Sequence, residues 1–238
     1  MGMEKKDLYN AIWKRRSVRK YLDKQIEKSK VDAIKESISS LNEISGLTMD
    51  LVEDGGSFRS ILALMFKNVR SVIVLKGKTD DPDLYEKCGY YGEQIVLEAT
   101  VLGLGTCWVM AFNKKFAPLK KDDETIACTI TVGYGAEGMS ESTKVPLAPH
   151  RKTRGVSDFL GGNTQVPEWV TSAMKAVQFA PSARNSQKIR FDHAEGKLSA
   201  KIPDGKMNMI DLGIAKFHFE LAAGGTFELG SPGLFRKN

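Results

Sequence analysis

Two stretches of this chain, residues 92–103 and 213–224, follow one pattern without a gap. Each begins at a glycine, continues as a long apolar segment and ends at a second glycine in front of a strand-like segment. Residues 90–102 are apolar on nearly every side, which predicts a buried helix. Because a repeat constrains the whole architecture, we expect two related halves, the second shorter than the first.

Hydrophobic periodicity places the other elements. In the first half we expect helices at 4–15, 27–41 and 90–102, and strands at 47–53, 71–75, 106–111 and 126–132. In the second half we expect helices at 168–179 and 208–223, and strands at 188–194, 197–202 and 225–229. The run at 71–75 is typical of a central strand covered on both faces, and 190–194 is expected to pair with 198–202 as a hairpin. The second half offers no counterpart of the strands at 71–75 and 126–132.

The composition argues against several classes of protein. The net charge is +6, but the basic residues mostly alternate with acidic ones, without the basic stripe and interleaved aromatics of a nucleic-acid binder. No signal peptide and no membrane span is apparent. The three cysteines lack CxxC spacing, and Cys107 and Cys128 lie in apolar runs, so we expect buried free thiols in the cytoplasm. The three histidines lack metal-ligand spacing, and no metal is expected.

A basic cluster follows the first expected helix and consists of Arg15, Arg16, Ser17 and Arg19. Arginine forks match phosphate oxygens two at a time, so the cluster could hold a phosphate. Basic residues in a last helical turn also complement the helix dipole, which leaves a purely structural role open.

A second basic cluster, Arg151, Lys152 and Arg154, lies between the expected strand at 126–132 and the helix at 168–179. It belongs to a segment at 135–165 that is rich in Gly, Ser, Pro and Lys, and connections of that length are usually functional or linkers. We interpret the segment as a crossover with a hinge at Gly161 and Gly162. The basic residues would form a second clamp on the same anion only if the fold brings the two clusters together.

Residues 180–187, APSARNSQ, follow a helix directly. Proline with serine and asparagine neighbours is typical of a helix stop. The segment also offers a hydroxyl, an amide and free backbone groups, which can fix the polar edge of a flat heterocycle in a pocket. It is the most specific segment of the chain.

With these motifs the chain resembles the nitroreductase family, over nearly its whole length. The resemblance rests on the Arg-Arg-Ser-x-Arg start, the helix–strand unit at 92–108, the strand end at Gly133 and Tyr134, and the Pro-Ser-x-x-Asn-x-Gln turn. It is closest to a subgroup in which one chain mimics the usual dimer. This implies an α+β fold with a central mixed or antiparallel sheet surrounded by helices and a pseudo-two-fold axis within the chain. Residues 1–160 would be the first repeat and 161–238 a truncated second one, together one compact unit.

The resemblance also implies a flavin mononucleotide (FMN) site. The phosphate and ribityl chain would be held by Arg15, Arg16, Ser17 and Arg19. Two of the three residues Arg151, Lys152 and Arg154 would make further phosphate contacts, and the resemblance leaves open which two. The ring would be bordered by Pro181, Ser182, Ala183, Asn185 and Gln187, and the backbone at Met110 and Ala111 would lie against flavin N5. No side chain is expected to be catalytic.

The resulting hypothesis is an FMN-dependent oxidoreductase that passes hydride from NAD(P)H through flavin N5 to a small electron-poor acceptor such as a nitroaromatic or a quinone. A flavin-binding protein without turnover is the alternative, and an anion- or nucleic-acid-binding module is a third class. Because both sides of the site lie on one chain, we expect a monomer with one FMN; a homodimer is the other arrangement.

Overall fold

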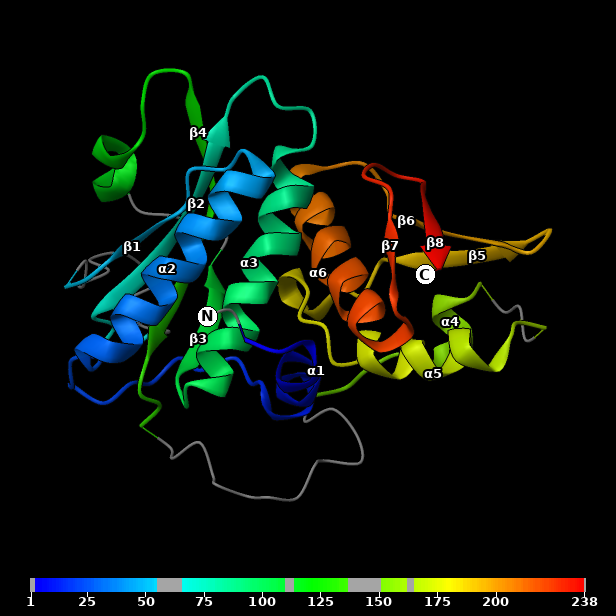
Figure 1. Cartoon of the computed structure of the whole chain (residues 1–238), viewed down its shortest axis with the longest axis horizontal. Helices are drawn as coiled ribbons and strands as arrows, with labels where there is room; N and C mark the ends of the chain where they lie inside the picture. Colours follow the sequence, from blue (N-terminus) through cyan, green and yellow to red (C-terminus); the bar gives the residue numbers. More distant parts are fainter. Residues whose placement is uncertain (1–2, 55–65, 110–113, 137–150, 162–164, 238) are drawn as a thin grey trace.

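Residues 3–54, 66–109, 114–136, 151–161 and 165–237 are described by a computed structural model of the chain (Figure 1). The first half contains α1 (Lys5–Lys14), α2 (Lys28–Ser45), β1 (Asp50–Val52), β2 (Ser71–Lys78), α3 (Leu84–Val101), β3 (Gly105–Val109), the 3-10 helix η2 (Lys114–Leu119) and β4 (Glu124–Gly133). The second half contains α4 (Val156–Phe159), α5 (Glu168–Val177), η3 (Ala183–Asn185), β5 (Arg190–Ala194), β6 (Lys197–Lys201), α6 (Lys206–Ala223), β7 (Gly225–Phe227) and β8 (Gly233–Lys237).

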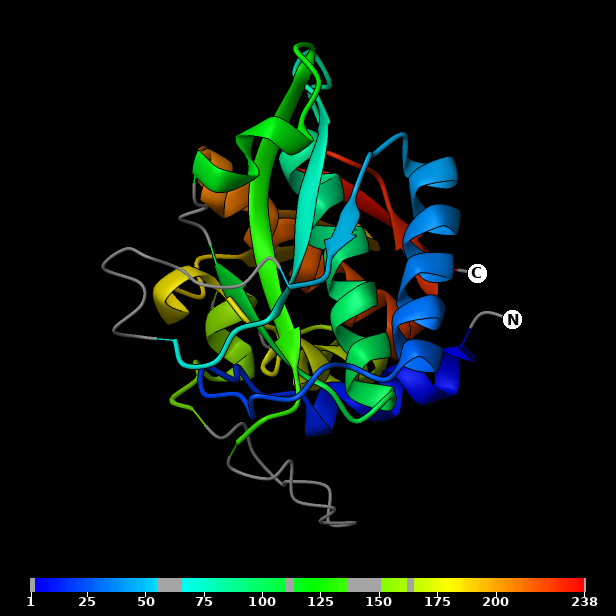
Figure 2. The same ribbon diagram turned by 90° about the vertical axis from the view of Figure 1, so that its left-hand side faces the viewer.

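The first sheet has the strand order β1-β2-β4-β3, and all its pairs are antiparallel. Alternate side chains of β2 face opposite sides of this sheet. Ile73 and Leu75 pack into the main core with α2 and α3, whereas Val72 and Val74 pack with Phe116 of η2 on the other face. Figure 2 shows α2 and α3 on one side of the sheet and η2 on the other. The uninterrupted apolar run of β2 is thus explained by two covered faces, as its sequence predicts.

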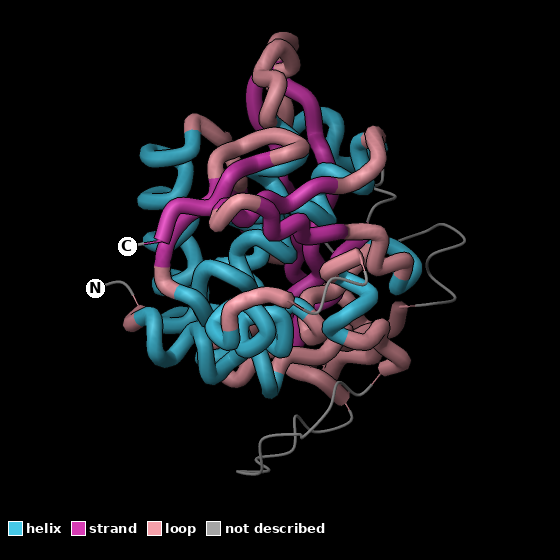
Figure 3. Tube along the Cα trace, turned by 90° about the vertical axis from the view of Figure 1, so that its right-hand side faces the viewer, coloured by secondary structure: helices cyan, strands magenta, loops and turns pink. Residues whose placement is uncertain are grey.

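The second sheet has the order β5-β6-β8-β7 and is also antiparallel. Its β5–β6 hairpin confirms the expected pairing, with Arg190 opposite Lys201 and Ala194 opposite Lys197. Figure 3 shows the strands of this sheet passing over the helices. The two sheets share the same order, so β6 takes the place of β2 and β8 the place of β4. The expectation that the second half lacks both counterparts is therefore wrong, because these strands are short and β8 carries no apolar run that would mark it.

The helices α3 and α6 each have 18 residues and lie side by side between the two sheets (Figure 1). Their approach is close at two glycines: a Cβ on Gly89 would lie 2.1 Å from the carbonyl oxygen of Ile210, and one on Gly213 would lie 2.1 Å from that of Glu86. Only glycine allows the two backbones to come so near. One buried core runs through both halves across this contact.

The observed boundaries differ from the expected ones at most elements, and α3, β1 and β3 are three examples. Helix α3 begins at Leu84, six residues before its apolar run, since its first turns alternate polar and buried residues. Strand β1 covers only 50–52, because only those residues pair with β2. Strand β3 ends at Val109, and Met110 and Ala111 lie outside the described residues.

Candidate functional site

The chain leaves α1 in an extended conformation that runs beside the first sheet. Val18 donates its backbone N–H to Thr106 (2.8 Å), and its side chain rests on Gly105, where a Cβ would come within 2.6 Å of Val18. Side chains alternate along this extended segment. Arg15 is only 3% exposed, whereas Arg16 faces solvent.

Arg15 and Arg151 form the centre of the site. The Nη2 of Arg151 donates to the carbonyl oxygen of Ala180, at the start of the 180–187 turn. Burial, together with the nearby charge of Arg15, lowers the pKa of Arg151 to about 10, although Glu93 acts in the opposite direction. Nε of Arg15 and Nη1 of Arg151 are buried and have no hydrogen-bond partner within the described part of the chain. A buried and a half-buried guanidinium group, each with a donor left without a partner among the described residues, are suited to an anion.

Gln187 joins the second basic cluster to the turn. Its side-chain oxygen accepts from the hydroxyl of Thr153 and the backbone N–H of Arg154, both at 2.9 Å, and its amide nitrogen donates to the carbonyl of Lys152 (3.1 Å). The side-chain amide of Asn185 donates to the same Lys152 carbonyl (2.8 Å). Lys152 and Arg154 are thus fixed through their backbones, and their charged side chains remain exposed.

The turn holds three non-glycine residues in the left-handed region: Arg184 (φ 53°), Asn185 (φ 55°) and Gln187 (φ 48°). This conformation is unfavourable for residues with a Cβ, least so for asparagine. Three of the four residues 184–187 adopt this conformation, so the turn is locally strained. Surrounding contacts must maintain such strain, and it often marks a functional segment.

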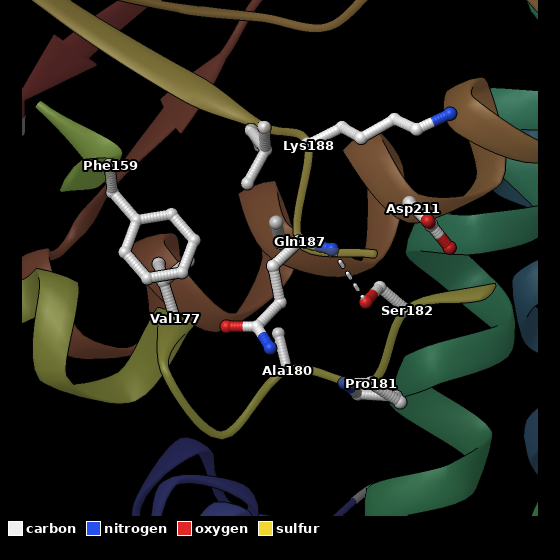
Figure 4. A pocket seen from close by; sticks show the side chains of 10 residues that line it. Phe159, Val177, Ala180, Pro181, Ser182, Gln187, Lys188 and Asp211 are labelled. Carbon is white, nitrogen blue, oxygen red and sulfur yellow. Dashed lines mark hydrogen bonds between the residues drawn. The ribbon is translucent and has the colours of Figure 1, made fainter. Parts of the chain in front are cut away.

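Asp211 of α6 binds the backbone of the turn through hydrogen bonds. Both its carboxylate oxygens accept from the backbone N–H of Ala183, at 2.9 and 3.1 Å. Burial raises the pKa of Asp211 to about 6. A hollow of about 260 Å³ opens here. In Figure 4, Phe159 and Val177 lie on one side of it and Ser182 and Asp211 on the other.

A polar cluster beneath the arginines was not predicted from the sequence. Glu93 of α3 and His218 of α6 are both fully buried, and Glu93 Oε1 lies 2.9 Å from His218 Nε2 and 3.8 Å from Arg15 Nε. Trp108 donates its indole N–H to Glu93 Oε2 (2.8 Å). Charged residues are almost never fully buried unless paired. Their presence inside two apolar helical segments was the signal that could have revealed them.

The fold brings part of the expected set together and leaves part apart. Arg15, Arg151 and the 180–187 turn converge, and the Ser17 hydroxyl contacts the thiol of Cys107. Arg16 and Arg19 face solvent beside them. Pro181 is buried, Ser182 and Ala183 are half-buried and Asn185 is exposed. Met110 and Ala111 fall outside the described residues, as do Gly162 of the expected hinge and His150. The three cysteines are free and buried, as expected.

The family model described as "Putative TM nitroreductase" matches residues 7–223. The chain belongs to this family. Nitroreductases are oxidoreductases, and the match supports that general class. No match was found among curated proteins. None of the described helices has the length and apolar character needed to span a membrane.

One of the solved structures similar to this chain supports the fold. A "putative nitroreductase" of Thermotoga maritima is 22% identical and superposes with a TM-score of 0.65, over 99% of this chain and 94% of that one. An "FMN-dependent Nitroreductase" of Clostridium difficile (24% identity, TM-score 0.44) is covered over 90% of its length by 58% of this chain. A "putative nitroreductase in complex with FMN" from Desulfovibrio desulfuricans (16% identity, TM-score 0.44) is covered over 92% by 59% of this chain. The antiparallel sheets and flanking helices of this chain agree with the α+β fold expected from its sequence.

Proposed function

We propose that this chain is an FMN-dependent oxidoreductase of the nitroreductase type. The observation that carries the proposal is the pair formed by the buried Arg15 and the half-buried Arg151. Each has a buried donor without a partner among the described residues, and Arg151 binds the first residue of a strained polar turn. FMN combines a phosphate dianion with a flat heterocycle, and these two features of the site are complementary to it. Family membership and the FMN named for two structural neighbours agree with this choice.

In this proposal Arg15 and Arg151 bind the phosphate, and the exposed Arg16, Arg19, Lys152 and Arg154 add positive charge around it. The turn at 181–187 borders the polar edge of the ring. Most of this hollow is open to solvent, and its enclosed part is far too small to hold the ring, so it would take one edge of the ring only. Met110 and Ala111 would contact the flavin near N5.

When bound, FMN supplies the redox chemistry, by which hydride from NAD(P)H reaches an electron-poor acceptor such as a nitroaromatic or a quinone. The chain's residues bind the phosphate, orient the ring and exclude water. None of them is required as an acid or base in this scheme. Buried free cysteines fit a reducing compartment, which here would be the cytoplasm.

The assembly proposal follows from the same geometry. Arg15 and Arg151 belong to the first proposed repeat (1–160) and the turn at 180–187 to the second (161–238), so one chain supplies both sides of the site. Covalent linkage replaces the association of two subunits, and we propose a monomer with one FMN. A homodimer with two flavins, identified by light scattering together with flavin quantification, would contradict this arrangement.

A flavin-binding protein without turnover is the second candidate, and two features of the turn favour it. The backbone N–H of Ala183 already donates to Asp211, and the hydroxyl oxygen of Ser182 already accepts from the backbone N–H of Gln187. In addition, Arg184 is charged and exposed at the turn. Donors that are already engaged contribute less to a ligand than free ones.

The test combines colour, reduction and two matched variants. Purified or FMN-reconstituted protein should be yellow, and NADH or NADPH should bleach it without oxygen; colour without bleaching supports the second candidate. Arg15→Ala should weaken FMN binding by roughly tenfold to a hundredfold, because a charge-assisted hydrogen bond contributes about 1.5–3 kcal/mol. Arg16→Ala, next to it but exposed, should have a much smaller effect. Protein that cannot be reconstituted, or equal effects of the two variants, would refute the proposed site.

A further inference from the structure

The buried Glu93–His218 pair determines how much positive charge the two arginines present. Glu93 Oε1 lies 3.8 Å from Arg15 Nε, and Glu93 also contributes to the electrostatic environment of Arg151. If this carboxylate stood alone, it would cancel one of the two guanidinium charges, and the buried centre of the site would carry one net positive charge. A site with one net charge would suit a phosphate dianion poorly.

The hydrogen bonds of His218 lead to a different net charge for these buried groups. Its Nδ1 lies 3.0 Å from the carbonyl oxygen of Ala176. A carbonyl can only accept, so Nδ1 carries a hydrogen. Its Nε2 lies 2.9 Å from Glu93 Oε1, and two lone pairs cannot face each other at that distance. A second proton must therefore lie between Nε2 and Oε1.

That proton makes the pair neutral wherever it resides. On His218 it gives an imidazolium beside a carboxylate, and on Glu93 it gives a neutral ring beside a carboxylic acid. Trp108, which donates to the other oxygen of Glu93, carries no charge. Arg15 and Arg151 remain charged because guanidinium groups keep their protons in proteins. Arg15, Arg151, Glu93 and His218 then sum to two positive charges, all of them buried or half-buried.

We propose that His218 neutralises Glu93, so that Arg15 and Arg151 together match a phosphate monoester dianion. Glu93 holds Arg15 in place, and His218 prevents the Glu93 carboxylate from cancelling one of the two arginine charges. Both are positioning residues that do not touch the ligand. The inference rests on the proposed function for the identity of the ligand as FMN. Its charge count applies to any dianionic phosphate.

The experiment measures the contribution of the phosphate group by itself. The affinity ratio of FMN to riboflavin isolates it, and the thermal shift caused by inorganic phosphate provides a probe that needs no flavin. His218→Gln should lower the FMN-to-riboflavin ratio by about tenfold or more, because it leaves an uncompensated carboxylate beside the anion. Adding Glu93→Gln to this variant removes that carboxylate and should restore the ratio. His193→Gln, on β5, is the control for loss of a histidine.

Glu93→Gln alone keeps the test decisive if His218→Gln does not fold. Its amide can accept from Trp108 and donate to a neutral His218, so the sum of charges stays at two and the ratio should stay close to that of the native chain. A ratio that rises in Glu93→Gln would show that Glu93 normally cancels one arginine, and this would overturn the inference. A double variant with a lower FMN-to-riboflavin ratio than His218→Gln would also overturn the inference, because the two substitutions would then act only as additive structural losses. If inorganic phosphate gives these responses while FMN is not bound, the inference stands and the proposed function fails.

Discussion

Replacing Gly213 with alanine should separate the two halves of the molecule. An added Cβ would lie 2.1 Å from the carbonyl oxygen of Glu86 and 2.6 Å from the backbone nitrogen of Tyr90. Both atoms belong to the backbone of α3, so no rotamer change relieves the contact. The helices α3 and α6 must move apart by about 1 Å to restore an ordinary van der Waals distance.

Two opposing effects set the magnitude. Alanine favours a helix over glycine by about 1 kcal/mol, whereas an overpacked core that requires backbone movement costs about 3 kcal/mol or more. The separation would also stretch the buried contacts between the helices, such as the Tyr90–Glu220 hydrogen bond. The net loss in the free energy of unfolding should be at least about 2 kcal/mol, which lowers Tm by roughly 4–8 °C for a domain of this size.

Gly92→Ala is the matched comparison on the facing helix. A Cβ there meets side-chain atoms only, those of Trp108 at 2.7 Å and Leu75 at 2.9 Å, and side chains can adjust at smaller cost. Urea unfolding and thermal melts of the three proteins should rank native above Gly92→Ala and Gly92→Ala above Gly213→Ala. A Gly213→Ala variant as stable as the native chain would show that the backbones are not in close contact, and the helix pairing described here would be wrong.

Two further perturbations test the buried charges. The ammonium group of Lys216 donates to Glu86 and to the carbonyls of Glu228 and Gly230, so Lys216→Met should lower the free energy of unfolding by about 3–5 kcal/mol, because it leaves a buried carboxylate unpaired. Lys201→Met, at an exposed pair, should lower it by less than about 1 kcal/mol. Equal losses in urea titrations would contradict the buried network. Asp211 has its pKa raised from 3.8 to about 6 by burial; because the folded state binds the extra proton, its stabilising contribution is complete below about pH 4 and is lost as the pH rises through 6. The native chain should therefore lose stability relative to Asp211→Asn between pH 4 and 6, and a flat difference over that range would refute this.

The sequence was sufficient for most of the architecture because the strongest patterns are local. The run at 71–75 identified β2, and the segments 190–194 and 198–202 identified the β5–β6 hairpin, whose observed pairing of 190–194 with 197–201 is shifted by one residue from the expected one. Strand β8 (Gly233–Lys237) was missed because it is mostly exposed, so its residues carry no periodic apolar signal. Its position is determined by pairing with β6 and β7, which no local pattern contains.

The site was predictable in its parts and less so in its arrangement. The sequence indicated two arginine clusters and a polar turn, but not which arginine points inward. That depends on how the segment after α1 lies against β3, where Val18 donates to Thr106 and rests on Gly105. Likewise, Glu93 and His218 are far apart in sequence and meet only because α3 and α6 cross where they do. Tertiary contacts of this kind are invisible to periodicity.

The buried polar pairs between α3 and α6 connect the fold to the site. Both helices are buried on most sides, and apolar surfaces alone would tolerate several alignments of two such helices, since hydrophobic contact is not directional. Glu86 with Lys216, Glu93 with His218 and Tyr90 with Glu220 are all paired in the alignment that the structure shows. We infer that these pairs select the register of the two helices, a role for which buried polar groups have precedent. Because Glu93 also lies beside Arg15, and Asp211 of the same α6 anchors the turn, one register of the helices fixes both sides of the site.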